Sequence, residues 1–243
     1  MKKTNHMIQH VVIRHMIMGA VTLMLSLGFW LSRLDWDPEM RLWRAVGDAG
    51  WMIFWFSLIV GPLARIWTKS KGLVSWRREA GIWFGIIIFL HVFLILKGWM
   101  VWDLMRFFGY EWIDQFGRYA RIEPGFGLAN MVGMLAFIWA MILTATSTDW
   151  AVNRLGITAW KWLHNGAYII FYLTVAHVLY FFFIHYTISF HRSIPPNPNW
   201  FRYPFIILSL SVPIIQSLAF IKNVRQNSKR LGNRNITVKD AQV

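Results

Sequence analysis

Cysteine is absent from the whole 243-residue chain. Its absence excludes disulfides, iron–sulfur clusters, covalently attached c-type haem and thiol catalysis. Acidic residues are also scarce, with 11 Asp and Glu against 25 Lys and Arg, which gives a formal net charge of +14. In a soluble protein this excess would suggest nucleic acid, but here the position of the charges along the chain matters more than their sum. No nucleic-acid partner is expected.

Apolar residues are abundant and come in blocks near membrane-spanning length. Hydrophobic residues make up 56% of the chain and aromatic residues 17%, and the mean hydropathy is +0.42. Sixteen tryptophans fit the enrichment of this residue at membrane interfaces. The sequence predicts an all-α membrane protein, a six-transmembrane-helix bundle forming one integral membrane domain over residues 1–243. The expected spans are about 11–32, 48–67, 80–101, 126–146, 160–186 and 203–222.

The basic residues predict the orientation of this bundle. Most of the 25 Lys and Arg fall in segments that share a side with the N-terminus, which favours an N-in, C-in topology. The first span is expected to be a retained anchor and not a cleaved signal peptide. The connection 102–125 is predicted to form a short interfacial helix, and the Pro-rich connection 187–202 a rigid, non-helical one. The basic cytoplasmic tail 223–243 is expected to lie solvated against anionic headgroups. No internal repeat is detected.

The fifth span carries three histidines, His164, His177 and His185. An ionisable side chain inside a membrane helix is costly and is read first as functional. His164 and His177 lie 13 residues apart (177 − 164), which is about 20 Å along a helix, so they can serve two layers of one membrane. The third span supplies a further histidine, His91. Two helices of one bundle that each carry an imidazole are what a b-type haem with both axial positions filled requires.

Depth in the membrane decides which histidines pair. The third and fifth spans cross in the same direction, and His91 lies 13 residues past Arg78 while His177 lies 16 past Lys161. This difference is only about 5 Å, which helix tilt absorbs. His164 lies three residues past Lys161, a mismatch of roughly 15 Å with His91. We therefore predict that His91 and His177 are the axial ligands of one haem b in the outer half of the bilayer. The alternative is a pair of helix-packing histidines that bond to backbone carbonyls.

His164 is left without a partner of this kind. A second haem would lack a ligand from the third span, although a methionine ligand keeps that alternative open. His164 instead lies near Arg77, Arg78 and Lys161 at the inner face. This group suits the phosphate of a flavin such as FMN, or a quinone whose carbonyl accepts a hydrogen bond. The alternatives are an interfacial histidine near the headgroups and a pair of anchoring arginines.

The other histidines carry weaker expectations. His185 is interpreted as a boundary residue of an aromatic belt, and His191 as a solvated loop residue. His6 and His10 have a spacing that can hold zinc on a helix. No carboxylate or cysteine completes such a site, so they are interpreted as part of a soluble leader. His15 is expected at the inner interface.

Three runs of sequence resemble a known family. They are PLAR at 62–65, RREAGIWFGIIIFLH ending at His91, and ATSTDWAVNRLGITAWKWLHNGAYIIFYLTVAH ending at His177. They are similar to the haem-binding membrane subunit of bacterial methionine-sulfoxide reductase systems, the MsrQ or YedZ family, which belongs to the wider ferric-reductase-like transmembrane group. The resemblance covers a haem-binding core of about 45–190 and leaves 203–222 as an additional helix. It implies that His91 and His177 are haem ligands and that His164 is the third characteristic histidine.

The resemblance also implies a function. The chain would be a multi-pass b-type cytochrome of the bacterial inner membrane. It would take electrons from the quinone pool or a cytoplasmic flavin reductase and pass them through haem b to a periplasmic molybdopterin-type reductase that repairs oxidised methionines. Whether FMN also takes part stays open. The chain would then be the electron-transfer subunit of an oxidoreductase. Because it has no nucleotide-binding fingerprint, a partner reductase or a quinol must supply the electrons.

Two alternatives stay open at this point. One is reduction of ferric chelates or of another periplasmic cytochrome by the same fold. The other, from a different class, is a haem-free transporter or assembly factor. A transporter usually shows inverted repeats or paired broken helices, and neither is detected.

Overall fold

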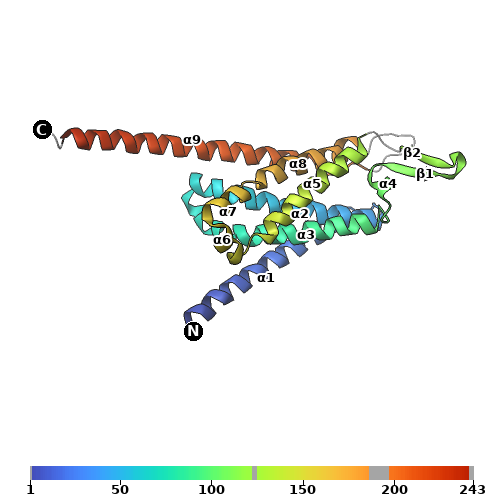
Figure 1. Ribbon diagram of the computed structural model, residues 1–243, viewed down its shortest axis with the longest axis horizontal. Helices are drawn as coiled ribbons and strands as arrows, with labels where there is room; N and C mark the ends of the chain where they lie inside the picture. Colours follow the sequence, from blue (N-terminus) through green and yellow to red (C-terminus); the bar gives the residue numbers. More distant parts are fainter. Residues whose placement is uncertain (1, 122–124, 186–196, 241–243) are drawn as a thin grey trace.

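The computed structural model describes residues 2–121, 125–185 and 197–240, which form an elongated helical bundle with one small hairpin (Figure 1). Six helical segments of the described chain are long and apolar enough to cross a membrane, which confirms the predicted number. Five of the six contain one long helix each, namely α1 (Lys2–Leu31), α2 (Pro38–Ile66), α3 (Arg77–Lys97), α5 (Phe126–Ala145) and α9 (Arg202–Asp240).

The remaining span is assembled from shorter pieces. It consists of α7 (Ile157–His164), α8 (Ala167–Leu179) and a π-helical turn, η3 (Tyr180–Ile184). A preceding short helix, α6 (Asp149–Leu155), is separated from α7 by Gly156, whose φ of +77° is a conformation that glycine adopts without strain. The sequence predicts one continuous segment from 160, whereas the structure interrupts the helix just after His164.

The connections also differ from expectation. A 3₁₀ segment, η1 (Thr68–Trp76), joins α2 to α3. In the connection 102–125, α4 (Leu104–Phe107) supplies a short helix, and an antiparallel hairpin follows it. The hairpin comprises β1 (Tyr110–Ile113), η2 (Asp114–Phe116) and β2 (Arg118–Arg121). Gly117 closes its turn with a φ of +56°.

The C-terminal segment is helical well past the predicted end at 222. Helix α9 continues to Asp240, so residues 223–240 of the basic tail extend the last span as helix. Hydropathy marks the part of a helix that can lie in lipid, whereas the helix itself ends where its backbone hydrogen bonds end. The expected contact of the tail with headgroups stays a prediction. His191 and most of the connection 187–202 lie outside the described residues.

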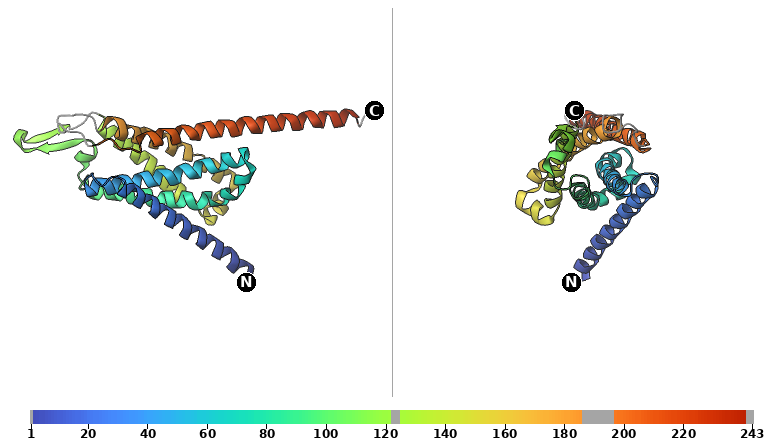
Figure 2. Two further views of the ribbon diagram at one scale, coloured as in Figure 1. Left: turned by 180° about the vertical axis from the view of Figure 1, so that it is seen from behind. Right: turned by 90° about the vertical axis from the view of Figure 1, so that its right-hand side faces the viewer.

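Both termini lie at one end of the bundle and the β1–β2 hairpin lies at the other (Figures 1 and 2). This arrangement agrees with an even number of membrane crossings. Helix α2 packs against α1, α3 and α9, while α5 packs against α8. An aromatic core at the middle of α2 joins these layers: Trp51 lies 4.6 Å from Phe205 and Phe54 lies 4.3 Å from Phe84, measured between ring centroids.

Candidate cofactor site

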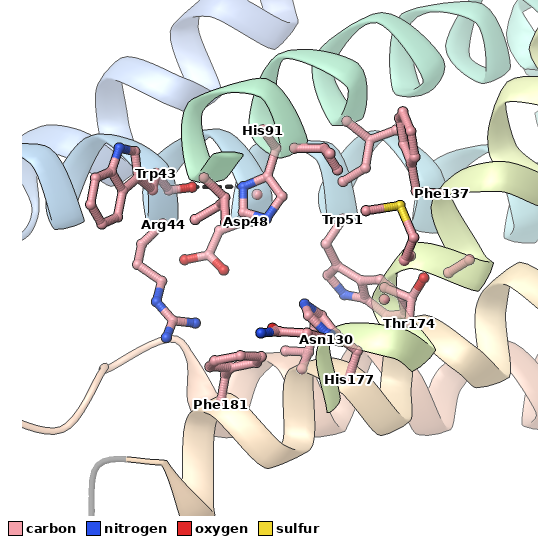
Figure 3. Close-up of a pocket in the computed structure, with 18 of the residues that line it drawn as sticks. Trp43, Arg44, Asp48, Trp51, His91, Asn130, Phe137, Thr174, His177 and Phe181 are labelled. Carbon is pink, nitrogen blue, oxygen red and sulfur yellow. Dashed lines mark hydrogen bonds between the residues drawn. The ribbon is translucent and has the colours of Figure 1, made fainter. Parts of the chain in front are cut away.

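A cavity of about 550 Å³ lies among α2, α3, α5 and α8 (Figure 3). Its size is that of pockets that enclose small molecules and cofactors. Most of its lining is aliphatic or aromatic, and His91 and His177 both belong to it. Polar side chains line it at Arg44, Asp48, Asn130 and Thr174. The structure therefore brings the two histidines paired by depth in the sequence to one cavity.

His91 is oriented by the backbone of α2. Its Nδ1 lies 2.9 Å from the carbonyl oxygen of Trp43 (Figure 3). A carbonyl can only accept a hydrogen bond, so in the neutral imidazole Nδ1 carries the proton and Nε2 keeps its lone pair. Gly47, one turn beyond Trp43, leaves room for the ring, since a Cβ there would lie 2.9 Å from Cε1 of His91.

His177 repeats this arrangement on the other helix pair. Its Nδ1 lies 2.8 Å from the carbonyl oxygen of Ala129 on α5. Gly133 stands four residues after Ala129, and a Cβ at Gly133 would lie 2.5 Å from Nδ1 of His177. In both pairs the histidine follows its carbonyl partner by 48 residues. The site thus contains a structural repeat that the sequence analysis does not detect.

The chemical consequence is a matched pair of nitrogen donors. Figure 3 shows His91 and His177 on opposite sides of the cavity, each approaching it from its own helix pair. A backbone carbonyl that holds the distal ring nitrogen fixes both the tautomer and the ring direction of a metal-binding histidine. Two imidazole lone pairs across an apolar cavity are a donor set for an iron that a planar macrocycle holds in its other positions.

A buried ion pair supports the polar part of the wall. Asp48 on α2 pairs with Arg33, which precedes α2 and is only 2% exposed. The guanidinium of Arg33 also lies 5.4 Å from the ring of Trp36. Arg44, one turn before Asp48, extends across the cavity to within 5.0 Å of the ring of Phe181. The sequence analysis missed these residues, although an acid inside an apolar stretch is itself a signal of function.

His164 lies apart from the residues that line the cavity. Its Nε2 lies 3.2 Å from Oγ1 of Thr146, and its ring stacks on Trp160 with centroids 4.0 Å apart. Arg78 reaches the same connection between α5 and α6, where Nε donates to the carbonyl of Ser147 at 2.9 Å and Nη1 lies 2.7 Å from Asp149.

These contacts hold part of the predicted inner group together. His164 and Arg78 meet at residues 146–149, whereas Arg77 directs its guanidinium toward α2, where a Cβ built at Gly61 would lie 3.7 Å from its Nη1.

His185 has aromatic neighbours, as expected of a residue in an aromatic belt, since its ring lies 5.2 Å from both Phe126 and Phe181. It also lines the cavity, which the sequence does not predict. No group of three or more His, Cys, Asp or Glu suited to a metal ion occurs within the described part of the chain. His10 belongs to that part, while the side chain of His6 lies outside it.

Comparison with known proteins gives one family. The family described as "Ferric reductase like transmembrane component" matches residues 46–175. Three bacterial proteins named "Protein-methionine-sulfoxide reductase heme-binding subunit MsrQ" are similar to the chain. The protein from Caulobacter vibrioides is 33% identical over 148 residues, that from Polaromonas naphthalenivorans 28% over 150, and that from Bordetella pertussis 30% over 152.

The matched region is 61% of this chain in each case, and it spans 64%, 61% and 66% of the three relatives. The match therefore covers less than two thirds of the length of these proteins. No solved structure matches the chain.

Proposed function

Because the chain belongs to the ferric reductase like transmembrane component family, we propose that it is a b-type cytochrome that relays electrons to a reductase on the outer side of the membrane. Its six apolar helices and its family make it a multi-pass protein of the bacterial inner membrane. The observation that carries the proposal is the matched pair His91 and His177, each with Nδ1 bonded to a backbone carbonyl beside the same cavity.

The residues present fit haem b. The cavity of about 550 Å³ has a mostly apolar lining, and its two imidazoles come from separate helix pairs. A haem attached through thioether bonds is excluded because the chain has no cysteine. When bound, haem b supplies a one-electron iron couple. His91 and His177 would hold the iron from both sides, and Arg44, which reaches into the cavity, is a cation suited to a carboxylate of the macrocycle.

The direction of transfer follows from the proposed N-in, C-in topology. Most Lys and Arg belong to segments on the side of the termini, which is expected to be cytoplasmic. Electrons would enter there from the quinone pool or a cytoplasmic flavin donor and leave at the end that carries the hairpin.

The names of the relatives support a methionine-sulfoxide reductase as the acceptor. We extend this to a catalytic subunit of the molybdopterin type. The family's own description favours a second candidate, reduction of ferric chelates by the same membrane domain.

The inner group is proposed as the entry point for electrons. His164 and Arg78 are both bonded to residues 146–149, so an imidazole and a guanidinium stand close to one short connection. With Arg77 nearby in sequence, this group suits the phosphate of FMN or the carbonyl of a quinone. The same residues would hold either ligand.

Difference spectroscopy tests the haem proposal directly. The dithionite-reduced minus oxidised absorption spectrum of the purified protein would be recorded, and its haem content measured by the pyridine haemochrome assay. The variants His91→Ala, His177→Ala and His164→Ala would be treated in the same way. We expect a b-type α-band in the wild type, a loss of more than about tenfold in the first two variants, and retention in the third. The variant His15→Ala is a matched control outside the cavity.

Each result has a distinct meaning. Loss of haem in His164→Ala, with about two haems per chain in the wild type, would replace the single-haem proposal by a two-haem one. A well-folded wild-type protein that takes up no haem would contradict the cytochrome and favour a haem-free role.

A further inference from the structure

We propose that one face of the β1–β2 hairpin, formed by Tyr110, Trp112, Tyr119 and Arg121, docks an acidic surface of the soluble reductase that accepts the electrons. The inference rests on the proposed function and adds to it the surface that the outer partner would contact. The hairpin lies beyond the helices at the end opposite both termini (Figures 1 and 2). In the proposed topology that end is on the outer side.

The strand register defines the docking face. Tyr110 pairs with Arg121, and Trp112 pairs with Tyr119. Directly opposed residues of an antiparallel pair share one face of the sheet, so these four side chains lie together. Trp112 is 51% exposed and Tyr119 is 42% exposed. Tyrosine, tryptophan and arginine are the residues that most often dominate the binding free energy of protein interfaces.

The face is ordered in the absence of a partner. The indole Nε1 of Trp112 donates to Asp114 at 2.8 Å, and the rings of Trp112 and Tyr119 meet edge to face with centroids 5.3 Å apart. These contacts restrict the rotamers before binding, which reduces the entropy that docking would cost. A lone two-stranded hairpin is marginal in water, so the bundle must contribute to its order.

The bundle supports the hairpin through residues that also line the cavity. Asn130 donates from Nδ2 to the carbonyl of Phe107 at 2.8 Å, and both residues line the cavity. Arg106 lies 5.6 Å from the ring of Trp99, another lining residue, and 3.8 Å from Glu111 on β1. The base of the hairpin is therefore continuous with the cavity wall. A protein docked on the hairpin would lie on the same side as this part of the cavity wall.

The charge on the docking face favours an acidic partner. Among the acids of 102–121, Asp103 caps α4, Glu111 lies 3.8 Å from the guanidinium of Arg106, and Asp114 accepts an indole N–H. Arg121 lies on the docking face, is exposed and forms no ion pair with any residue that the structure describes, whereas the register places Glu111 and Arg118 on the opposite face. An exposed basic surface attracts and orients an acidic one over long range, and this attraction weakens with salt.

Binding can be measured without relying on electron transfer. Because the chain has no cysteine, Gln115→Cys at the exposed hairpin tip allows a single fluorophore to be attached. Full-length labelled protein in nanodiscs would be titrated with the catalytic subunit of the methionine-sulfoxide reductase from the organism that carries this chain. We expect saturable binding that weakens as salt rises.

Three variants would be compared in the labelled protein. Trp112→Ala combined with Tyr119→Ala should weaken binding by at least about tenfold. Arg121→Glu, which reverses the charge on the docking face, should also weaken binding and reduce its salt dependence. Arg154→Glu, an exposed basic residue on α6 outside the hairpin, should leave the affinity unchanged.

Unchanged affinity in both hairpin variants would overturn the docking face, as would failure of the wild type to bind. Quenching of the Gln115→Cys fluorophore by doxyl-labelled lipids would also overturn it, because the hairpin would then lie in the headgroup region, where Trp and Tyr also gather. The reduced α-band of the same samples tests the haem separately. If the α-band is intact and the hairpin variants bind as the wild type does, only the docking face is refuted. If the hairpin variants lose binding and the protein shows no α-band, only the haem proposal is refuted.

Discussion

The imidazole of His177 lies so close to the backbone of Gly133 that a Cβ on this glycine would stand 2.5 Å from Nδ1. Real Cβ atoms do not approach other atoms this closely, so any side chain at this position would displace the ring. The glycine thereby keeps His177 within 2.8 Å of the carbonyl of Ala129. The direction of the proposed ligand depends on a residue that has no side chain.

Gly133→Ala is therefore expected to reduce haem content by about tenfold, the range seen when an outer partner of a metal ligand is lost. Gly47→Ala should have a smaller effect, because a Cβ there would lie 2.9 Å from the ring of His91. Pyridine haemochrome assays of purified protein provide the measurement. Gly81→Ala on α3 is the control, since a Cβ at Gly81 meets nothing within 4 Å. Equal haem content in all three variants would contradict this role for the glycines.

The Arg33–Asp48 pair yields a prediction about stability. Arg33 is 2% exposed, and two of its guanidinium nitrogens, Nε and Nη1, have no hydrogen-bond partner among the described residues. Asp48→Asn would leave this buried charge unpaired, which typically costs about 3–5 kcal/mol. Replacing both residues, as Arg33→Met with Asp48→Leu, should recover much of the loss. Unfolding in mixed SDS and detergent micelles would report the free energies.

A matched exposed pair provides the comparison. Arg78 and Asp149 lie 2.7 Å apart, with side chains 48% and 84% exposed. Solvent screens such a pair, so Asp149→Asn should change the free energy of unfolding by less than about 1 kcal/mol. A cost for Asp48→Asn as small as that for Asp149→Asn would show that water or another group compensates Arg33.

The inner group predicts a kinetic effect without loss of haem. Thr146→Val removes the hydroxyl that lies 3.2 Å from Nε2 of His164, and His164→Ala removes the ring. Reduction of the haem by a short-chain ubiquinol or by reduced FMN, followed by stopped flow, should slow by about tenfold or more for the donor that uses this group, as expected when a positioning contact is lost. Unchanged rates with both donors would refute entry at His164.

Depleting the cofactor should lower stability. Haem that binds the folded chain and not the unfolded chain stabilises it by about 2.7 kcal/mol when free haem is near 100 times its dissociation constant. Thermal unfolding of haem-loaded and haem-depleted preparations should therefore differ, and added haem should restore the higher midpoint. The double variant His91→Ala with His177→Ala should show no such shift. A shift of the same size in that variant would place haem elsewhere in the protein.

The sequence predicts the spans well because lipid imposes a strong requirement on length and polarity. The six long apolar segments agree with the structure. The sequence does not predict the break after His164 or the extension of α9 to Asp240, because both depend on backbone hydrogen bonds that hydropathy does not record. The short helix predicted in 102–125 is present as α4, but the sequence analysis does not predict the hairpin at Tyr110–Arg121, although its aromatic residues and the glycine at 117 favour a strand and a turn.

For the candidate site too, the sequence predicts one part and not another. Depth along the helices is enough to predict that His91 and His177 lie beside one cavity, because rise per residue is nearly constant. The partners of these rings are not predictable in this way. Contact of His91 with Trp43, or of His177 with Ala129, depends on how each helix is rotated about its axis. That rotation is set by packing across the whole bundle, including small residues such as Gly133.

The division of the site between two helix pairs has a consequence for biosynthesis. Translation delivers α2 and α3 before α5 and α8, and these two helices contain His91 and the carbonyl of Trp43 that it contacts. The helix that bears His177 follows only after α5 and the short helices α6 and α7. Since chains are made from the N-terminus, a half-built protein presents a single oriented imidazole. If both imidazoles hold the haem as proposed, its stable capture must wait for the second pair, and loading is then a late step of membrane insertion.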